Sequence, residues 1–434
     1  MIERVSKIAG EIEKEIISYR RDFHRYAETG WVEFRTASII ARRLTDWGYR
    51  VKVGRDLFKD DHRMGLPSPD VLEEEWQRAV EQGGDPEFLD AVRGGFTGVM
   101  GILGNGQGPT IGLRFDIDAL GVQESHSQDH RPVREGFASV NEGAMHSCGH
   151  DGHAAIGLGV AKVLMELKNE IRGTVKLVFQ PAEEGVRGAK AMVSAGIVDD
   201  VDYMLGHHLY SGRKVGEISG GRGGYLATTK FDALFTGAPA HAGGSPQGGK
   251  NALLAAATAV LNLYAIPRHR DGATRINVGS LAAGTGRNVI PANAHLAIET
   301  RGQTTELNEH MYDYALRVLE TSAAMHDCTL ETRLMGGAQG ANSDVKLAER
   351  VEKIALEMGD FSVQVSEGGG GSEDYTYMMT RVQENGGLAT HIGVGADLGG
   401  WGHHTSEFDI DESAFTGAIK ILSAVVLDIM KEWR

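Results

Sequence analysis

The chain has 434 residues, of which 41% are hydrophobic and 24% are charged. This length exceeds what one ordinary compact core accommodates, and the composition is that of a globular protein, so we expect two or three domains. Acidic residues outnumber basic ones by 59 to 44, giving a formal net charge of -15. Nucleic-acid binding needs a basic face that replaces phosphate counterions, so this balance argues against nucleic acid as a partner.

The N-terminal residues and the cysteine content together predict a cytoplasmic protein. Residues 1–23 carry charges every few positions, with no apolar core after a basic start, so a secretory signal is not expected. No stretch approaches the length of a membrane span, and no membrane partner is expected. The two cysteines, Cys148 and Cys328, lie far apart in the sequence. A disulfide framework is therefore not expected, and a reducing compartment fits.

The chain opens with helix signals. Apolar residues spaced three or four apart predict a first helix: Val5, Ile8, Ile12 and Ile16. A second helix is expected over residues 34–47, ending at Gly48. Residues 55–94 are expected to form a loop with a solvated helix. That segment either covers a site or decorates the surface.

Alternating strand and helix signals follow. Strands are predicted at residues 97–103, 110–115 and 174–179. A helix is expected over residues 152–167, between the last two strands. This alternation predicts an α/β sheet covered by helices.

The middle of the chain contains two more strand-helix-strand units. Strands are expected at residues 227–236, 276–279 and 294–300, and helices at 251–264 and 306–325. Two such units could form a small domain inserted into the larger one. The last part returns to helices, expected at residues 342–358, 373–380 and 412–431. Four glycines at residues 368–371 predict a tight loop.

The strongest local motif is MHSCGHDGH at residues 145–153. The Cys148 thiolate and the His150 imidazole can approach one metal ion, and we expect Gly149 to remove a side chain that would crowd that approach. Alternatively, Cys148 is a small buried hydrophobe and the histidines decorate a helix start. Three histidines within eight residues weaken this alternative.

Two adjacent carboxylates, Glu183 and Glu184, follow a predicted strand. Open α/β sheets place their sites just beyond such strand ends. One acid can bind metal while its neighbour takes a proton from metal-bound water. A solvated turn is the alternative interpretation.

Two histidine pairs complete the candidate metal groups: His207-His208 and His403-His404. Adjacent strand residues face opposite ways, so at most one histidine of each pair should point into a shared site. Together with the Cys-x-His motif and the Glu-Glu pair, in a chain with only 17 histidines, they favour a metal centre.

Three further residues could contact a substrate. His241 is surrounded by small residues, which would let it reach out and donate a hydrogen bond; a flexible turn is the alternative. Asn288 offers an amide. Arg301 offers a guanidinium that suits bidentate capture of a carboxylate, although an ordinary surface ion pair explains it equally.

Further anchors along the chain are residues 114–120, 240–242, 286–291 and 404–412. In this order the motifs resemble the aminoacylase and carboxypeptidase G family of two-metal peptidases. They resemble more closely its amidohydrolase branch, which includes hippurate hydrolase and the plant-hormone conjugate hydrolases. The similarity covers almost the entire chain.

The resemblance implies an α/β catalytic domain, a mixed sheet covered by helices, at residues 1–223 and 334–434. An inserted α+β domain at residues 224–333 would serve as lid and dimerisation domain. The expected assembly is a homodimer or a hetero-oligomer with a related B subunit.

The same resemblance implies roles for individual residues. The metal ligands would be Cys148, His150, Glu184, His208 and His404. Cys148 would bridge two divalent ions as a thiolate, with Mn²⁺ expected in preference to Zn²⁺. Glu183 would be the general base and later the acid, and His241 would reach a neighbouring site and stabilise the oxyanion. Asn288 and Arg301 would hold the substrate carboxylate.

The chain departs from the wider family at one position. Where much of that family has His-x-Asp, this chain has Arg114 and Asp116. An arginine cannot ligate a cation, so that metal set is excluded and Asp116 at most supports the ligands. The choice of His208 and His404 within their pairs rests on spacing to neighbouring residues.

The expected reaction is hydrolysis of the amide bond between an aromatic acyl group and an amino acid, with p-aminobenzoyl-glutamate as the first substrate. Indole-3-acetyl-aspartate and hippurate-like amides are alternatives with the same chemistry. A non-catalytic partner subunit is an alternative of another class. A metal-storage or sensor protein would not need Glu183 beside Glu184.

Overall fold

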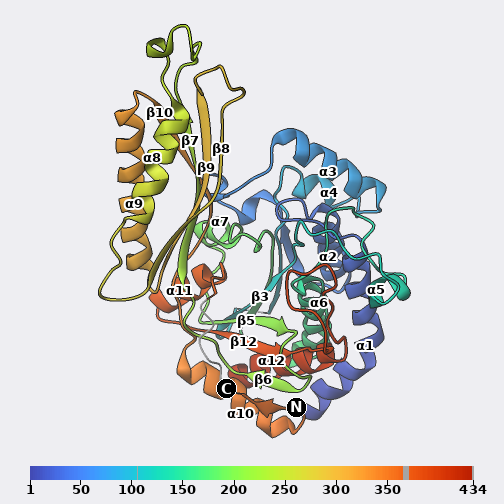
Figure 1. Cartoon of the computed structure of the whole chain (residues 1–434). Coiled ribbons are helices and arrows are strands. Elements are labelled where there is room, and N and C mark those ends of the chain that lie inside the picture. The colour runs from blue at the N-terminus through green and yellow to red at the C-terminus, as the bar shows by residue number, and fades with distance from the viewer. Residues whose placement is uncertain (105, 365–370, 433–434) are drawn as a thin grey trace. The chain divides into compact units, whose positions relative to one another are not determined.

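The computed structural model describes residues 1–104, 106–364 and 371–432, which form two compact units (Figure 1). The second unit begins at Gly224, where the inserted domain was expected to begin. The chain returns to the first unit at Asn342 instead of at residue 334, because strand β10 (Thr329–Ala338) pairs along its length with β7 (Ala227–Thr236). Of the glycines at residues 368–371, the first three lie outside the described residues.

The first unit is built on one mixed sheet. Its described strands are β1 (Arg50–Val53), β2 (Val99–Gly104), β3 (Thr110–Asp116), β4 (Thr174–Gln180), β5 (Tyr203–Tyr210), β6 (Glu217–Ser219), β11 (Ser362–Val363) and β12 (Leu388–Gly395). They lie in the order β1-β2-β4-β3-β5-β12-β6-β11. β3 pairs in parallel with both β4 and β5, and β5 pairs in parallel with β12. Four neighbouring strands therefore run in one direction.

Helices cover this sheet, as the α/β interpretation predicted. They are α1 (Ile2–Arg25), α2 (Phe34–Asp46), α3 (Pro69–Glu81), α4 (Leu89–Val92), α5 (Arg131–Arg134), α6 (His150–Glu166), α7 (Ala189–Ser194), α10 (Val345–Met358), α11 (Thr376–Glu384) and α12 (Ala414–Lys431). Among these helices, none is long and apolar enough to cross a membrane within the described residues.

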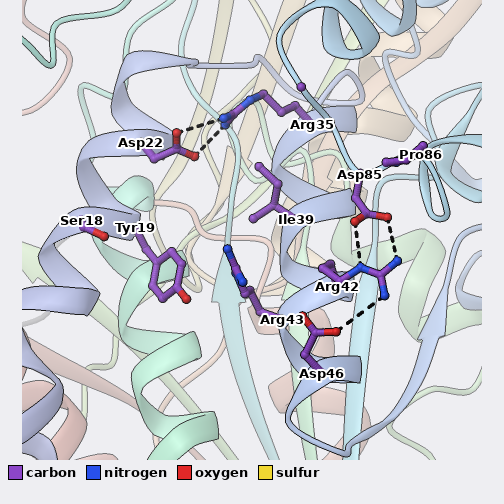
Figure 2. A pocket seen from close by; sticks show the side chains of 12 residues that line it. Ser18, Tyr19, Asp22, Arg35, Ile39, Arg42, Arg43, Asp46, Asp85 and Pro86 are labelled. Atoms are coloured by element: carbon purple, nitrogen blue, oxygen red, sulfur yellow. Dashed lines mark hydrogen bonds and ion pairs between the residues drawn. The ribbon is translucent and has the colours of Figure 1, made fainter.

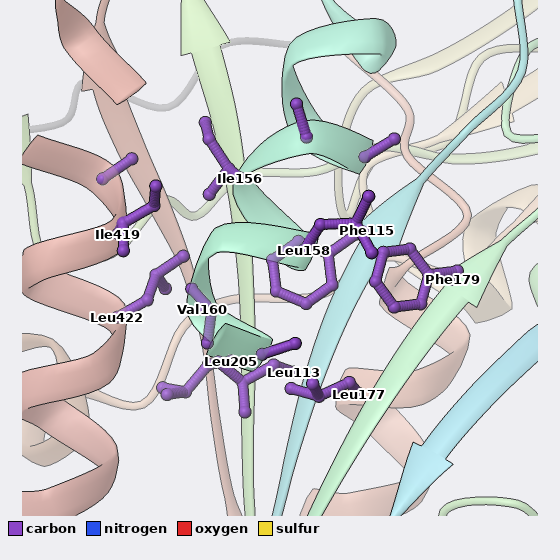
Figure 3. Packing of buried hydrophobic residues seen from close by; sticks show 14 of the residues in the cluster. Leu113, Phe115, Ile156, Leu158, Val160, Leu177, Phe179, Leu205, Ile419 and Leu422 are labelled. Atoms are coloured by element: carbon purple, nitrogen blue, oxygen red, sulfur yellow. The ribbon is translucent and has the colours of Figure 1, made fainter. Parts of the chain in front are cut away.

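Helix α6 is packed closely on two sides, which fixes the helix start that carries His150. A Cβ atom at Gly157 would come within 2.6 Å of the Phe179 ring in β4. A Cβ atom at Gly159 would come within 2.3 Å of Ile419 in α12. Figure 3 shows α6 between aromatic side chains of the sheet and apolar side chains of α12. Glycine at these two positions lets the helix approach both neighbours.

The second unit has a four-stranded antiparallel sheet in the order β10-β7-β9-β8, with β8 (Thr274–Ala283) and β9 (Asn293–Gly302). Helices α8 (Ala252–Tyr264) and α9 (Thr305–Met325) lie side by side against it (Figure 1). Their apolar side chains and those of the sheet make a separate core. This α+β architecture agrees with the expected fold class.

Most predicted elements are present with ends shifted by a few residues, whereas strands β1, β6, β10, β11 and β12 were not predicted. The solvated helix expected within residues 55–94 is α3, which buries only Leu72 and Ala79. β10 escaped prediction because its Gly336 and Gly337 are typical of a turn. β12 escaped because glycines and His391 interrupt its apolar pattern.

We predict that Phe179→Ala lowers the free energy of unfolding by roughly 3–5 kcal/mol, because it empties a ring-sized space in a close-packed core. Phe179 is fully buried and its ring centroid lies 5.3 Å from that of Phe115. Urea denaturation followed by circular dichroism measures the loss. The control is Val71→Ala on α3, whose side chain is 43% exposed. Equal urea midpoints for Phe179→Ala and Val71→Ala would contradict the close packing described for Phe179.

Candidate metal centre

The candidate metal ligands lie where the four parallel strands end. Asp116 ends β3, Glu183 and Glu184 follow β4, and His208 lies near the end of β5. Because parallel strands present their carboxyl ends at one edge of a sheet, these side chains collect there. Cys148 and His150, at the start of α6, join them, as does His404 from the segment after β12.

The predicted ligands form two groups that share one residue. The ligand atoms of Cys148, His150 and His208 all lie within 4.8 Å of one another, and so do those of Cys148, Glu184 and His404. Cys148 Sγ lies 3.5 Å from His208 Nε2, and Glu184 Oε1 lies 3.6 Å from His404 Nε2. Two neighbouring groups with a common thiol are the arrangement that a bridging thiolate requires.

Two buried atoms in this cluster point to a cation. His150 Nε2 and Glu184 Oε1 lie 3.9 Å apart, and neither has a hydrogen-bond partner although both are buried. A buried polar atom without a partner is costly, and a metal ion between these two atoms would satisfy both. The donor set of thiol, imidazole and carboxylate accepts Mn²⁺ or Zn²⁺. The residues present therefore fit a divalent metal.

Gly149 has a different role from the one predicted. A Cβ atom at this position would meet its nearest neighbour, Ile410, at 3.7 Å, which is ordinary contact, so crowding does not explain the glycine. Its backbone φ is 91°, a left-handed value that residues with side chains rarely adopt. Gly149 makes the turn that places Cys148 and His150 on the same cluster.

A third group, consisting of Asp116, His150 and His153, also lies within ligand distance. Asp116 is already engaged by Arg114 at 2.6 Å and by His153 Nδ1 at 2.5 Å. His153 Nε2 accepts a hydrogen bond from the Leu209 backbone N–H at 2.9 Å. Both nitrogens of His153 are therefore occupied. This geometry fits Asp116 and His153 as supports of the ligands.

The charges around Asp116 keep it ionised. Burial alone would raise the pKa of Asp116, but Arg114 and His150 hold it well below its usual value. The negative charge faces His150 Nε2 at 3.7 Å. An ionised carboxylate beside this imidazole adds to the attraction for a cation.

Asp118 organises the carboxylate loop, a role the sequence analysis did not assign. Its two side-chain oxygens accept the backbone N–H groups of Glu183 and Glu184 at 3.0 and 2.9 Å. Its carbonyl oxygen lies 2.9 Å from His150 Nδ1, so that nitrogen carries the proton and Nε2 faces the cluster. The signal in the sequence was a second aspartate two residues after the end of a strand.

Each histidine pair sends one member to the cluster. His207 Nδ1 and Nε2 are buried away from it, and its ring packs edge-on against Phe115 at 5.4 Å. His208 Nδ1 lies 2.7 Å from the Leu209 carbonyl oxygen, which leaves Nε2 facing Cys148. In the second pair, His404 approaches Glu184, whereas the His403 ring packs on Phe408 at 4.9 Å. Strand alternation accounts for the His207-His208 pair in β5, whereas His403 and His404 lie in a turn.

Burial favours the uncharged forms of Cys148, Glu184 and His208 in the metal-free cluster. Burial raises the pKa of the Cys148 thiol, and the nearby Glu184 carboxylate adds to this effect. Burial likewise raises the pKa of Glu184 to about 7. For His208, burial lowers the pKa well below the usual value, so its imidazole is neutral and able to ligate. A cation would replace the thiol proton, as metal binding to cysteine requires.

Glu183 lies beside the metal groups without belonging to either group that contains Cys148. Its Oε2 is 4.0 Å from His150 Nε2, and the residue is 9% exposed. Glu183 also forms a group with His150 and Glu184, whose ligand atoms all lie within 4.8 Å of one another.

Arg187 connects the carboxylate loop to the segment of residues 55–94. Its Nε donates to the Glu184 carbonyl at 2.8 Å and its Nη1 to the Gly65 carbonyl at 3.2 Å. The indole N–H of Trp31 donates to the Met64 carbonyl at 2.8 Å. One end of this segment therefore lies against the candidate site, while α3 is solvated, so each of the two interpretations of the segment describes a part of it.

The three predicted substrate residues lie in the second unit. The His241 and Asn288 loops are joined by the Ala242 N–H, which donates to the Asn288 carbonyl at 3.0 Å. Arg301 lies near the opposite end of β9, where it pairs in register with Thr228 and forms an ion pair with Glu299 at 3.0 Å. The structure brings His241 and Asn288 together and does not bring Arg301 to them.

A cavity of about 710 Å³ beside α1 and α2 includes none of the candidate residues (Figure 2). Its charges largely neutralise one another: Arg35 pairs with Asp22 at 2.8 Å, and Arg42 pairs with Asp85 at 2.8 Å. We assign this cavity no part in the chemistry.

Comparison with known proteins agrees with the geometry of the cluster. The profile of peptidase family M20/M25/M40 matches residues 112–428, which is more than half of the chain. The chain belongs to this M20 family. It is accordingly an enzyme of the metallo-amidohydrolase and peptidase class. The family resemblance drawn from the sequence is confirmed.

Individual M20 relatives match over nearly the whole chain. Indole-3-acetyl-aspartic acid hydrolase of Enterobacter agglomerans is 48% identical, with 95% of each chain covered. A p-aminobenzoyl-glutamate hydrolase subunit of Escherichia coli (strain K12) is 44% identical, with 98% of each covered. Among solved structures, the aminobenzoyl-glutamate utilization protein from Klebsiella pneumoniae has a TM-score of 0.85 at 40% identity, with 98% of each chain covered. This similarity confirms the expected fold.

We predict that Cys148→Ala lowers metal content and activity together, because a shared thiolate would hold both ions. Elemental analysis after dialysis, run beside an amide-hydrolysis assay, measures both quantities. The matched control is Cys328→Ala in the second unit, which should change neither. Full metal occupancy in Cys148→Ala would remove this residue as the bridge.

Proposed function

We propose that this chain is a two-metal amidohydrolase that cleaves the amide bond between an aromatic acyl group and an acidic amino acid. The observation that carries the proposal is the pair of ligand groups sharing Cys148, with Glu183 beside them. The ligands would be Cys148, His150, Glu184, His208 and His404. The M20 resemblance favours Mn²⁺ over Zn²⁺ as the ion.

The residues of the cluster would divide the chemistry between them. Two bound divalent ions would supply a lowered pKa for a water molecule and polarise the amide carbonyl. Glu183 would take the proton of that water and later hand it to the leaving amine. His241 would donate a hydrogen bond to the developing oxyanion, which is where such donors contribute most.

Two substrates fit the proposal, and p-aminobenzoyl-glutamate is the first. The relatives named for p-aminobenzoyl-glutamate and for indole-3-acetyl-aspartic acid are similarly close, at 44% and 48% identity. Both compounds join an aromatic acyl group to an acidic amino acid, so the shared chemistry is the firmer part of the proposal. Arg301 and Asn288 would receive a carboxylate of the amino acid.

The positions of His241 and Arg301 support a homodimer. They lie at opposite ends of the second unit's sheet, and eight residues of extended β9 between Asn293 and Arg301 span roughly 26 Å. One small substrate cannot touch both ends of this sheet in one copy, so we propose that a second copy supplies His241 together with the neighbouring Asn288. β8 lies at one end of the described four-stranded sheet, and Leu261 on α8 is 75% exposed, which suits a self-associating surface.

We predict that Glu183→Ala keeps its metal but loses about a hundredfold to ten-thousandfold in turnover, because the general base is missing. Steady-state kinetics and elemental analysis on the same preparation measure both effects. The matched control is the adjacent Glu184→Ala, which should lose metal as well as activity. If Glu183→Ala keeps more than half of the wild-type rate, the assigned role is wrong.

We predict that mixing two variants of strongly reduced activity, His241→Ala and Arg301→Ala, raises the activity if each site uses both copies. Random exchange gives half of the dimers one intact site, so roughly one quarter of wild-type activity should return. The variants are mixed under conditions that allow subunit exchange and assayed against each variant alone. Mixtures whose activity does not rise while exchange is shown by mass spectrometry would place both residues at the same copy's site.

We predict that converting the substrate's α-carboxylate to an amide hurts the wild type strongly and Arg301→Ala much less, because a buried Arg–carboxylate contact is worth about 2–5 kcal/mol. Equal losses in both enzymes would remove Arg301 from carboxylate binding.

A screen of benzoyl, aminobenzoyl and indole-acetyl conjugates of Glu, Asp and Gly would identify the substrate. A preference for indole-acetyl-aspartate would select the second candidate.

A further inference from the structure

One buried arginine in the N-terminal helix makes ion pairs with three carboxylates. Arg20 of α1 is 0% exposed. Its Nε donates to Asp151 at 2.7 Å, its Nη2 to Asp409 at 2.8 Å and its Nη1 to Glu412 at 3.2 Å. The three nitrogens of one guanidinium therefore bind three separate acids.

These carboxylates belong to the two segments that bring candidate ligands from opposite parts of the sequence. Asp151 directly follows His150 in the first turn of α6. Asp409 and Glu412 follow His404 by five and eight residues. A rigid planar group that binds both segments fixes the distance between them.

His404 depends on such support more than His150 does. The His404 side chain is 53% exposed, whereas that of His150 is 1% exposed. His404 also has a φ of 65°, which costs energy for a residue with a side chain and persists only where neighbours impose it. Its backbone N–H donates to the carbonyl of Ser147, the residue directly before Cys148, at 2.8 Å.

The surrounding charges complete this clamp. Arg131 donates to Asp409 at 2.5 Å, and His24 Nδ1 lies 2.7 Å from Asp151 Oδ2. A buried ion network of this kind stabilises a fold little compared with apolar side chains of the same volume. Its geometric effect is distinct, because it holds the α6 start and the 404–412 segment in one arrangement.

We propose that Arg20 is a positioning residue for the metal centre, and in particular for the ion held by Cys148, Glu184 and His404. The inference rests on the proposed two-metal function. Without Arg20, the 404–412 segment moves away from α6 and the ion that needs His404 is lost first. The ion held by Cys148, His150 and His208 stays, because the His150 and His208 rings are oriented by the Asp118 and Leu209 carbonyl oxygens, which lie outside that segment.

The test titrates metal-free protein with Mn²⁺ by calorimetry, comparing wild type, Arg20→Met, Arg20→Lys and Arg35→Met. Arg35 is the matched control: its side chain is 7% exposed and pairs with Asp22, outside both ligand segments. Wild type and Arg35→Met should bind two ions. Arg20→Met should bind one normally and the second about 10–100-fold more weakly, the range typical for groups that support ligands. Arg20→Lys should recover part of the difference.

A second readout needs no metal. Hydrogen exchange of peptides covering residues 403–412 in the metal-free protein should be faster in Arg20→Met and unchanged in Arg35→Met. If Arg20→Met does not fold, Asp409→Asn, which removes one charge of the clamp and keeps its shape, should weaken the second ion in the same way.

The outcomes separate the two proposals. A wild type that binds no ions overturns the proposed function, while the exchange experiment still tests the clamp. A wild type that binds two ions, beside an Arg20→Met that binds both normally or loses both equally, overturns the role of Arg20 and leaves the proposed function standing.

Discussion

Parallel pairing of β3 with β4 and β5, and of β5 with β12, is the constraint on which the site depends. It brings the ends of four strands to one edge, so residues more than two hundred positions apart in the sequence become neighbours. The ends of these strands and the loops that follow them carry the carboxylates and two of the histidines. Helix α6 then adds its cysteine and first histidine at the same edge, because its start lies against that end of the sheet.

The chemistry of the cluster follows from burial more than from any single contact. Burial drives the Cys148 thiol, the Glu184 carboxyl and the His208 imidazole towards their neutral forms, and His150 Nε2 and Glu184 Oε1 have no hydrogen-bond partner. Buried polar atoms without partners cost free energy, and a divalent ion bound by these side chains would give several of them a partner. Asp118 orients His150 and the glutamate loop in the metal-free protein through its hydrogen bonds to them.

Sequence reasoning was sufficient where a residue's chemistry and a short-range rule pointed the same way. The Cys-x-His motif, the adjacent glutamates and the two histidine pairs indicated which segments form the cluster, and the choice within each histidine pair rested on spacing to neighbouring residues. It failed where the deciding fact was a conformation or a long-range contact. The left-handed turn at Gly149, the two amides held by Asp118 and the reach of Arg20 depend on partners that the local sequence does not reveal. The second unit includes residues up to Ala341 for a similar reason, because β10 joins its sheet by pairing with β7.

Through Arg187, the segment of residues 55–94 contacts the carboxylate loop of the candidate site, although its helix α3 is solvated. The Arg187 guanidinium donates to both the Gly65 and the Glu184 carbonyl groups, and it therefore connects the segment to the carboxylate loop. Replacing the segment would therefore change hydrogen bonding at the candidate site. A chimera that replaced it with a short turn would leave Arg187 without one of its acceptors and free the glutamate loop to rearrange. Exchanging this region between relatives would transfer part of the catalytic geometry along with the surface.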